Sequence, residues 1–318
     1  MYSSSARARI AQNFILHPEV VTWDEIRRGH PAAQAAHAFF GTWGFPRLSA
    51  TDLSALPQLE IVFFAAGSIK AFGEPFLATG IKICTAKLAN ARVVADTCVA
   101  QITLAAKNFF GHARAYRDES YPALAENPRQ ASASLNGTHL ALIGGGMIAR
   151  EIIKRLAGSQ FKITVVDPYL SEVEAVRLGV SRNSLTHAFQ SCEVVSNHLP
   201  NLPELTSVIT EEHLRSMPPH ATFINTGRGA QVDEPGLIRA LQEREDLTAL
   251  LDVTSPEPPS HTSPLYRMPN VLLTPHIAGC QGGELEFLVN EVITSSERWL
   301  AGEPLENLET LENLKVSA

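Results

Sequence analysis

Three side chains with complementary chemistry each follow a short β-branched, apolar run of the sequence. Arg228, Glu257 and His276 come three, five and two residues, respectively, after the runs that precede them. If these runs are parallel strands, their carboxyl ends meet at one edge of a sheet, which is where open α/β sheets bind ligands. A guanidinium, a carboxylate and an imidazole at that edge can hold a small anion and transfer a proton while the anion is oxidised or reduced.

A glycine-rich turn further upstream indicates a dinucleotide site. Gly144, Gly146 and Ala149 match G-x-G-x-x-G/A directly after the apolar run 139–143 and at the start of a helical stretch. The glycines permit a tight turn and close approach of backbone N–H groups to a pyrophosphate, and Ala149 permits close helix–strand packing. Asp167 follows 23 residues after Gly144, at the end of the next run, where a carboxylate accepts the ribose hydroxyls.

The acidic residue at this point favours NAD over NADP. A carboxylate repels a 2′-phosphate, and the residues that follow Asp167, namely Pro168, Tyr169 and Leu170, offer no cation to bind one. The expected cofactor is therefore NAD.

Alternating strands and helices are predicted for the central part of the chain. Six apolar runs alternate with amphipathic stretches, which is typical of a parallel sheet covered on both faces, and six strands favour a doubly wound Rossmann sheet. Thr210 and Asp233 are predicted as helix N-caps, and Gly158 and Gly179 as left-handed C-caps. The predicted strands are 139–143, 162–166, 193–197, 221–225, 248–252 and 270–274.

The first hundred residues indicate a second, smaller α/β unit. The runs 59–67 and 80–86 are predicted strands, and the stretch 93–110 is apolar on nearly every face and must be buried on several sides. The helical stretch 284–300 lies beyond the last Rossmann strand, so we expect it to pack back onto the first unit. The predicted domains are a substrate domain of 1–100 and 286–318 and an NAD-binding domain of 101–285.

Longer segments of the chain share their pattern with one known family. NTGRGAQVDE (225–234), the block 250–279 with 19 residues from Glu to His, EVVSNHLPNLPELTSVI (193–209), 53–72 and 93–108 all resemble segments of the D-isomer-specific 2-hydroxyacid dehydrogenases. The resemblance covers most of the chain from about residue 50. It implies a discontinuous flavodoxin-like substrate domain, a central NAD domain and, as is usual in the family, a homodimer.

The residue types then suggest a role for each of these side chains in catalysis and substrate binding. His276 is the predicted acid/base group, with Glu257 bonded to its other ring nitrogen to fix the tautomer and favour the imidazolium. Arg228 offers a planar fork to the substrate carboxylate and polarises the carbonyl. The resemblance further implies that the carboxylate is held from the other domain by the backbone N–H groups of Gly67, Ser68 and Ile69.

The cofactor contacts are expected at the glycine turn and at strand ends. Met147 stands where the family often has Arg or His, so its contact with the pyrophosphate is expected through the backbone amide. Asp252 either contacts the nicotinamide carboxamide or has a structural role at its strand end. The predicted cofactor-binding residues are Gly144, Gly146, Met147, Ile148, Asp167, Pro200, Thr226 and Asp252.

Two side chains of the first unit have open roles. Lys70, in the GSIK loop, is either a substrate contact or a solvated lysine at a helix start. Trp43, in GTWGF, is assigned to the core in preference to the substrate pocket, because aromatic residues beside glycines are more often buried.

The composition argues against several classes of partner and of cellular location. A net charge of −7 without a basic run argues against nucleic acid or an anionic membrane as partner, and the longest apolar run, 61–66, is far short of the roughly 20 residues of a membrane span. The N-terminus has no apolar stretch of the signal-peptide type. Four cysteines without CxxC spacing indicate reduced core thiols, no metal site and a cytoplasmic protein.

The predicted function is NAD-dependent hydride transfer between a D-2-hydroxy acid and its 2-oxo acid. Glyoxylate, hydroxypyruvate, a branched 2-oxo acid or a dicarboxylate would all use the same three side chains. Formate oxidation is disfavoured because it needs no acid/base pair and the formate branch has Gln in place of Glu257. The alternative from a different class is an NAD(H)-sensing binding protein of the corepressor type, for which the chain has neither an obvious tail nor spare length.

Overall fold

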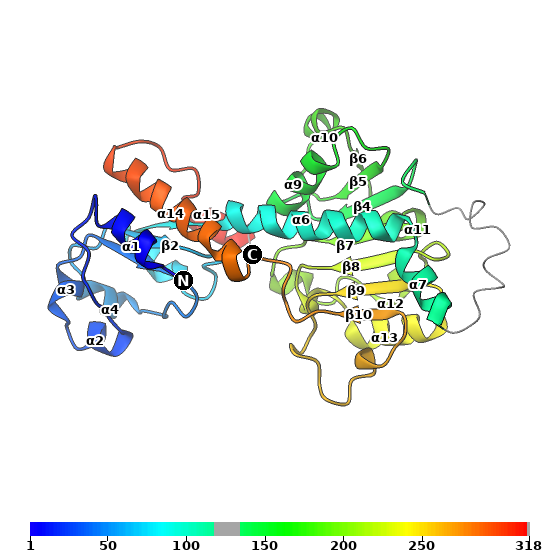
Figure 1. Ribbon diagram of the computed structural model, residues 1–318, viewed down its shortest axis with the longest axis horizontal. Helices are drawn as coiled ribbons and strands as arrows, with labels where there is room; N and C mark the ends of the chain where they lie inside the picture. The colour runs from blue at the N-terminus through cyan, green and yellow to red at the C-terminus, as the bar shows by residue number, and fades with distance from the viewer. Residues whose placement is uncertain (118–133, 317–318) are drawn as a thin grey trace. The chain divides into compact units, whose positions relative to one another are not determined.

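The computed structural model describes residues 1–117 and 134–316 of the chain (Figure 1). The chain divides into one unit of Met1–Val93 with Cys280–Ala318 and a second unit of Val94–Gly279. The chain passes between the units after Val93 and after Gly279, whereas the boundaries predicted from the sequence lie a few residues later, after residues 100 and 285. The assignment of the two units to substrate and cofactor remains a prediction from the sequence.

The second unit is built on a parallel sheet. Its strands are β4 (His139–Ile143), β5 (Lys162–Val166), β6 (Ser181–Arg182), β7 (Val194–Asn197), β8 (Thr222–Asn225), β9 (Thr248–Leu251) and β10 (Val271–Leu273). They lie in the order β10-β9-β8-β7-β4-β5-β6, and every neighbouring pair is parallel. All six predicted strands are present. The described sheet has a seventh strand, β6, so the predicted count of six is wrong. Strand β6 was not predicted because its two residues are too few to form an apolar run in the sequence. The strand order reverses at β4, which is where sheets of this type bind ligands.

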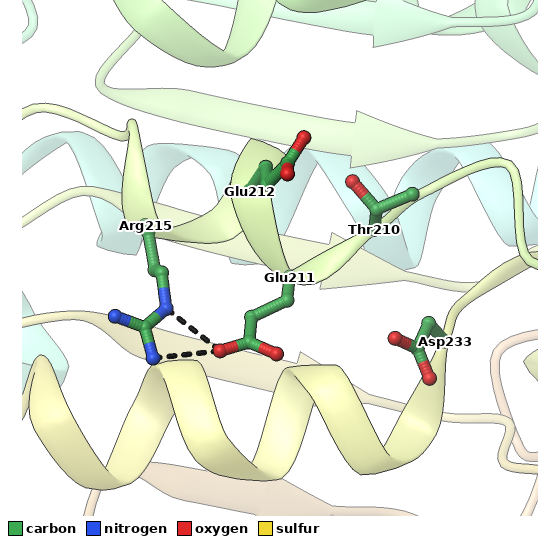
Figure 2. Close-up of a pocket in the computed structure, with 5 residues that line it drawn as sticks. All are labelled: Thr210, Glu211, Glu212, Arg215 and Asp233. Carbon is green, nitrogen blue, oxygen red and sulfur yellow. Dashed lines mark hydrogen bonds and ion pairs between the residues drawn. The ribbon is translucent and has the colours of Figure 1, made fainter.

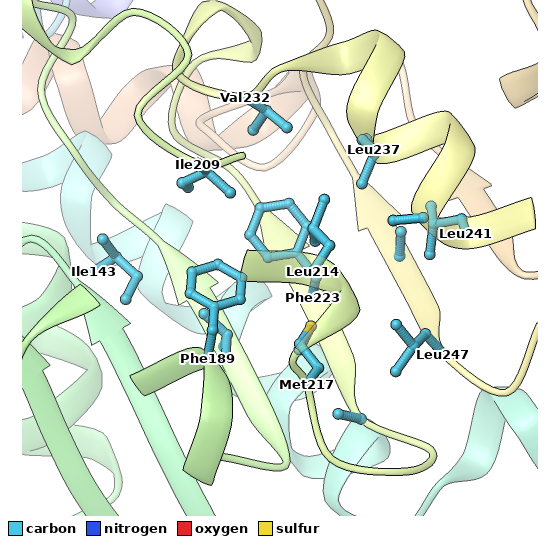
Figure 3. Packing of buried hydrophobic residues seen from close by; sticks show 14 of the residues in the cluster. Ile143, Phe189, Ile209, Leu214, Met217, Phe223, Val232, Leu237, Leu241 and Leu247 are labelled. Carbon is cyan, nitrogen blue, oxygen red and sulfur yellow. The ribbon is translucent and has the colours of Figure 1, made fainter. Parts of the chain in front are cut away.

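Helices cover both faces of this sheet. They are α6 (Lys87–Ala106), α9 (Met147–Arg155), α10 (Glu172–Leu178), α11 (Leu185–Ser191), α12 (Glu211–Arg215) and α13 (Glu234–Glu243). Successive strand residues point to opposite sides, so Leu142 packs with α6, α9 and α10, whereas Ile143 packs with α11, α12 and α13. Figure 3 shows the second of these clusters, with Phe223 of β8 among side chains from the helices.

The predicted helix ends of this unit are mostly found in place. Thr210 and Asp233 are the N-caps of α12 and α13, and Gly179 ends α10 in the left-handed conformation. Gly158 also has a positive φ, but α9 already ends at Arg155, so the C-cap predicted there is wrong. Helix α11 was not predicted.

The first unit is built on a smaller parallel sheet. Its strands, β1 (Ala38–Gly41), β2 (Ile61–Phe64) and β3 (Lys82–Thr85), lie in that order. The strands predicted within 59–67 and 80–86 are confirmed as β2 and β3, and β1 was not predicted. Alternate residues of β2 again face opposite clusters, Phe63 on one side and Phe64 on the other.

The C-terminal part of the chain returns to this first unit. Helix α14 (Leu285–Leu300) places Leu288 and Val292 in the same buried cluster as Phe63. The first unit is therefore discontinuous, as the predicted fold class requires. Its other helices are α1 (Ser4–Ile10), α2 (Trp23–Arg27), α3 (Pro31–Gln34), α4 (Ala50–Ser54), α5 (Gly73–Ala78) and α15 (Leu311–Val316).

The apolar stretch 93–110, predicted to be buried on several sides, is divided between two helices. Helix α6 ends at Ala106, and α7 (Phe109–Arg117) begins after Asn108, whose φ is 46°. Cys98 and Ile102 of α6 are buried in the second unit, whereas Leu104 is exposed. Within the part of the chain that the structure describes, no helix is both long enough and apolar enough to cross a membrane.

Candidate active site

The three predicted catalytic side chains lie beyond the carboxyl ends of neighbouring strands. Arg228 follows β8, Glu257 follows β9 and His276 follows β10, and these strands are consecutive in the sheet. Gly144 follows β4 at the same edge. The parallel sheet thus gathers residues that are far apart in sequence.

His276 and Glu257 are hydrogen-bonded to each other. Nδ1 of the ring lies 2.6 Å from Oε1 of the carboxylate, and the two side chains are still 48% and 41% exposed. A carboxylate can only accept a hydrogen bond, so Nδ1 carries the proton and the tautomer of the ring is fixed. Proton exchange with a ligand therefore falls to Nε2 on the other side of the ring.

The loop that presents His276 is anchored by Asp252. The Asp252 side chain is buried, and its carboxylate accepts hydrogen bonds from Thr274 Oγ1 at 2.6 Å, Ile277 N at 2.8 Å and Ala278 N at 2.9 Å. The backbone N–H of His276 donates to the Asp252 carbonyl, also at 2.9 Å. These bonds hold His276 at a φ of 56°, in the left-handed region that a non-glycine residue seldom adopts. Of the two roles left open for Asp252, its contacts support the structural one.

Arg228 is held close to the loop that follows β9. An added Cβ at the next residue, Gly229, would lie 2.0 Å from the Thr254 carbonyl carbon, so only a glycine lets the two loops approach. Arg228 Nη1 donates to the Gly227 carbonyl at 2.7 Å. Burial lowers the pKa of the Arg228 guanidinium, and the charge of Glu257 acts in the opposite direction. The guanidinium remains a cation at neutral pH and can bind a carboxylate.

The glycine turn has the shape that a dinucleotide requires. Gly144 has a φ of 92°, and a Cβ there would lie 2.8 Å from the His198 carbonyl oxygen, so this position needs glycine. A Cβ at Gly146 would meet nothing within 4 Å, so the outer side of the turn is open. Gly146 is the N-cap of α9, whose first N–H groups, at Met147 and Ile148, have no partner within the helix. These features fit a pyrophosphate.

Asp167 is tied to the same turn. Its two carboxylate oxygens accept hydrogen bonds from Gly145 N at 2.6 Å and Tyr169 N at 2.7 Å. Arg150, which the sequence did not single out, supports the turn from the helix side, because its Nε donates to the Gly145 carbonyl at 3.1 Å and its Nη1 pairs with Glu174 at 2.6 Å. Asp167 is therefore oriented before any ribose binds.

A buried histidine beside the loops predicted to bind the cofactor was missed by the sequence prediction. His198 follows β7; its Nε2 lies 2.9 Å from Ser196 Oγ, and its Nδ1 lies 3.5 Å from Oγ1 of Thr226, a predicted cofactor contact. Burial lowers the pKa of His198 to about 3, so the ring is neutral. Thr226 Oγ1 also lies 3.3 Å from Cys98 Sγ. His198 lies within the quoted segment EVVSNHLPNLPELTSVI (193–209), but a lone histidine in such a segment does not indicate which groups it contacts.

The predicted substrate loop, in the first unit, presents unused backbone donors. Gly67 and Ser68 are partly exposed and Ile69 is buried, and within the described part of the chain none of their three backbone N–H groups donates to another group. Consecutive N–H groups of this kind bind carboxylates. The loop has a suitable structure for the predicted contact.

The two residues with open roles are both on the surface of the first unit. Trp43 is 56% exposed, so its assignment to the core is wrong. It follows β1, and Thr42 Oγ1 donates to the Ala65 carbonyl at 3.4 Å, which joins this loop to the one after β2. Lys70 is exposed, and its backbone N–H donates to Ser68 Oγ at 3.4 Å. A substrate contact by Lys70 remains a prediction.

A surface hollow lies near the N-terminal ends of α12 and α13 (Figure 2). Its acidic groups are partly neutralised, because Glu211 pairs with Arg215 and Arg239, each at 2.6 Å. The hollow is lined by Thr210, Glu211, Glu212, Arg215 and Asp233, and none of these is a predicted catalytic or cofactor residue. Among the described residues, no group of three or more His, Cys, Asp or Glu side chains is arranged to hold a metal ion.

A parallel α/β unit with a glycine turn, an acidic residue after its second strand and a Glu–His pair is typical of the class of NAD-binding dehydrogenase domains. The sequence model described as the NAD-binding domain of the D-isomer specific 2-hydroxyacid dehydrogenases matches residues 99–278, more than half of the chain. The chain belongs to this family.

Individual relatives agree with this assignment. D-3-phosphoglycerate dehydrogenase of Mycobacterium tuberculosis is 27% identical over 257 residues, which cover 80% of this chain and 48% of that protein. The chloroplastic D-3-phosphoglycerate dehydrogenase 2 of Arabidopsis thaliana is 31% identical over 225 residues, 70% of this chain and 35% of that one. The chain thus spans about half or less of the length of these curated relatives.

Solved structures share the fold over nearly the whole chain. The apo form of D-mandelate dehydrogenase from Rhodotorula graminis superposes with a TM-score of 0.80 at 22% identity, covering 97% of this chain and 94% of that one. The NAD-complexed D-isomer specific 2-hydroxyacid dehydrogenase of Lactobacillus delbrueckii ssp. bulgaricus gives a TM-score of 0.74 at 18% identity, covering 97% and 98%.

Proposed function

We propose that this chain catalyses the NADH-dependent reduction of a small 2-oxo acid to the D-2-hydroxy acid, and the reverse oxidation. The observation that carries the proposal is the 2.6 Å bond between His276 Nδ1 and Glu257 Oε1 at the sheet edge where Arg228 also lies. An imidazole poised by a carboxylate can exchange a proton in both directions near neutral pH. A cation at the same edge can bind the acid group of the substrate.

Bound NADH would supply the hydride that the carbonyl carbon receives. As the carbon–hydrogen bond forms, the π pair of the carbonyl moves onto its oxygen, and that oxygen takes a proton from Nε2 of His276. Glu257 stabilises the imidazolium before this transfer, and Arg228 orients the substrate through its carboxylate and polarises the carbonyl. In the oxidation direction His276 accepts the hydroxyl proton.

The other contacts of the substrate and the cofactor belong to the same proposal. The N–H groups of Gly67, Ser68 and Ile69 hold the substrate carboxylate, a role supported by the absence of other acceptors for them among the described residues. The cofactor contacts are Gly144, Gly146, Met147, Ile148, Asp167, Pro200 and Thr226. Asp252 is proposed to act through the His276 loop.

The names of similar proteins suggest which substrates to try first. The test is NADH oxidation by the purified chain against glyoxylate, hydroxypyruvate, branched and aromatic 2-oxo acids and a 2-oxo dicarboxylate, with 3-phosphoglycerate and mandelate in the reverse direction. Turnover of at least one substrate that is abolished in His276→Ala supports the proposal.

The second candidate, an NAD(H)-sensing binding protein, predicts a different outcome of the same experiment. Such a protein would bind NADH but turn over none of these acids in either direction. The exposed Glu257–His276 pair favours the enzyme, because a sensor needs no group for proton transfer.

A further inference from the structure

Three buried carboxamides are hydrogen-bonded to one another next to the backbone of Arg228, and none of them pairs with a charged side chain. They are Asn197 at the end of β7, Asn225 at the end of β8, and Gln231 just beyond Arg228, and each is 1% exposed or less. Buried amides are costly unless every donor and acceptor is satisfied, so a complete set of bonds indicates a defined arrangement.

Gln231 joins two loops. Its Oε1 accepts from the backbone N–H of Arg228 at 3.1 Å, and its Nε2 donates to the carbonyls of Leu199 at 2.8 Å and Pro200 at 2.7 Å. The first loop carries the proposed substrate cation, and the second carries a proposed cofactor contact. One side chain thus ties the positions of both loops together.

Asn197 and Asn225 complete the connection. Asn197 Nδ2 donates to Asn225 Oδ1 at 3.0 Å and to Gln231 Oε1 at 2.7 Å, while its Oδ1 accepts from Leu199 N at 3.2 Å. Asn225 Oδ1 also accepts from Gly227 N at 3.1 Å, and its Nδ2 donates to the Arg228 carbonyl at 3.4 Å. Both backbone polar groups of Arg228 are therefore held by this network.

The backbone is shaped to leave room for the amides. A Cβ added at Gly227 would lie 2.9 Å from Gln231 Oε1 and 3.0 Å from Asn197 Nδ2. The contact with Oε1 is shorter than real Cβ atoms show, and the contact with Nδ2 is tighter than most of them, so a side chain at residue 227 would displace the two amides.

We propose that Asn197 and Gln231 are positioning residues that orient the Arg228 guanidinium by clamping its backbone against the Leu199–Pro200 loop. The proposal rests on the proposed function of Arg228 as substrate anchor. A hydrogen bond in a low-dielectric interior holds a loop more rigidly than one that competes with water. The Arg228 guanidinium is therefore already oriented for the substrate carboxylate before the substrate binds.

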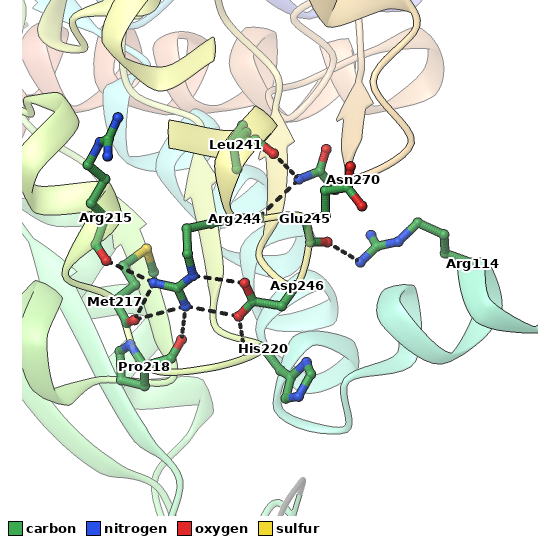
Figure 4. A network of polar contacts seen from close by, with 10 residues as sticks. All are labelled: Arg114, Arg215, Met217, Pro218, His220, Leu241, Arg244, Glu245, Asp246 and Asn270. Atoms are coloured by element: carbon green, nitrogen blue, oxygen red, sulfur yellow. Dashed lines mark hydrogen bonds and ion pairs between the residues drawn. The ribbon is translucent and has the colours of Figure 1, made fainter. Parts of the chain in front are cut away.

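The test compares Gln231→Met, which keeps the length of the side chain and removes its bonds, with Asn270→Leu. Asn270 is a matched control because it is a buried amide of the same unit that donates to the Leu241 and Arg244 carbonyls (Figure 4). It precedes β10, so it lies at the amino ends of the strands, away from the candidate site. Both variants lose stability. Gln231→Met removes four hydrogen bonds, and part of their free energy is lost in folding rather than in binding. We expect KM for the 2-oxo acid to rise about 10- to 100-fold, with a smaller change in kcat.

Hydrogen exchange supplies a readout that does not depend on turnover. The amide protons of the peptide containing residues 226–231 should exchange faster in Gln231→Met than in the wild type, and at the wild-type rate in Asn270→Leu. Gly227→Ala retains all three amides but forces them apart, so it should also raise KM and speed the exchange of the amide protons at 226–231. This variant replaces Gln231→Met in the test if Gln231→Met does not fold.

The possible outcomes distinguish a failure of the proposed function from a failure of the amide clamp. A wild-type chain that turns over none of the acids would refute the proposed function, while the exchange rates would still decide whether the amides clamp the Arg228 backbone. Equal changes of KM in Gln231→Met and Asn270→Leu, or unchanged exchange at 226–231 in both Gln231→Met and Gly227→Ala, would overturn the clamp.

Discussion

The short bond from His276 to Glu257 determines how the imidazole can act, because it leaves Nε2 as the nitrogen available to a substrate. Replacing His276 by Ala should lower kcat at least 10²- to 10⁴-fold, the contribution typical of a general acid or base. The measurement is steady-state turnover together with NADH binding by fluorescence. Binding within a few-fold of the wild type is expected, and a loss of binding equal to the loss of turnover would point to a structural role instead.

Glu257 contributes its charge as well as its hydrogen bond. In Glu257→Gln the hydrogen bond to Nδ1 can persist, but the negative charge beside the ring is lost, so the positive charge that accompanies the transferred proton is less well balanced in the transition state. We expect a loss of turnover that is smaller than in His276→Ala. Turnover equal to that of the wild type would argue against the pairing.

Asp167 is oriented by Gly145 N and Tyr169 N before the cofactor arrives. Its charge should therefore oppose a 2′-phosphate in a fixed position, and kcat/KM with NADH should greatly exceed kcat/KM with NADPH. Asp167→Ala should narrow this preference, chiefly by weakening NADH binding. Comparable kcat/KM values of the wild type for the two cofactors would refute the prediction.

At the scale of elements, the segment after β7 links stability to pH through His198. Burial depresses the pKa of this ring from 6.5 to about 3, so below pH 6.5 the unfolded chain binds a proton that the folded chain does not. The free energy of unfolding must then fall as the pH is lowered, and His198 alone contributes a loss of roughly 2 kcal/mol between pH 7 and pH 5.

Urea unfolding of the wild type and of His198→Gln at the two pH values measures this contribution. The wild type should lose roughly 2 kcal/mol more than the variant on going from pH 7 to pH 5. Parallel losses in both proteins would mean that other groups, not His198, respond to acid over this range.

At the scale of the whole molecule, we predict a homodimer with α6 and α7 near the interface. Helix α7 buries none of its described residues, and the large side chains of Leu104, Phe109 and Tyr116 are exposed along this part of the chain. Exposed apolar side chains of this size on a helix favour association. Sedimentation velocity should give a dimer for the wild type and a weaker one for Phe109→Glu.

Val173→Glu is the matched control for the dimer, because Val173 is an exposed apolar residue of α10, and it should sediment as the wild type does. A wild-type monomer at micromolar concentration, or equal weakening in both variants, would count against an interface at α6 and α7.

The residues proposed to act in catalysis and cofactor binding could be selected from the sequence because their signals are local. Arg228 and His276 each follow a β-branched run within a few residues, and the glycine turn and Asp167 follow the first and second strands in the same way. In a parallel sheet, a position just after a strand is already a position at the ligand edge, so the pattern predicts proximity without knowledge of the packing.

Contacts between distant segments were decided by the tertiary structure. The amides of Asn197 and Gln231 come from different loops, and nothing near either in sequence indicates that they share a hydrogen bond. The same holds for the three donors gathered by Asp252 and for the burial of His198. Trp43 was misassigned for a related reason, since an apolar side chain is buried only if other elements come to cover it. Residue type and spacing by themselves therefore indicated the proposed chemistry of this chain. Long-range packing decided which polar groups hold the proposed site in place, because buried donors and acceptors are satisfied by whichever segments the fold brings together.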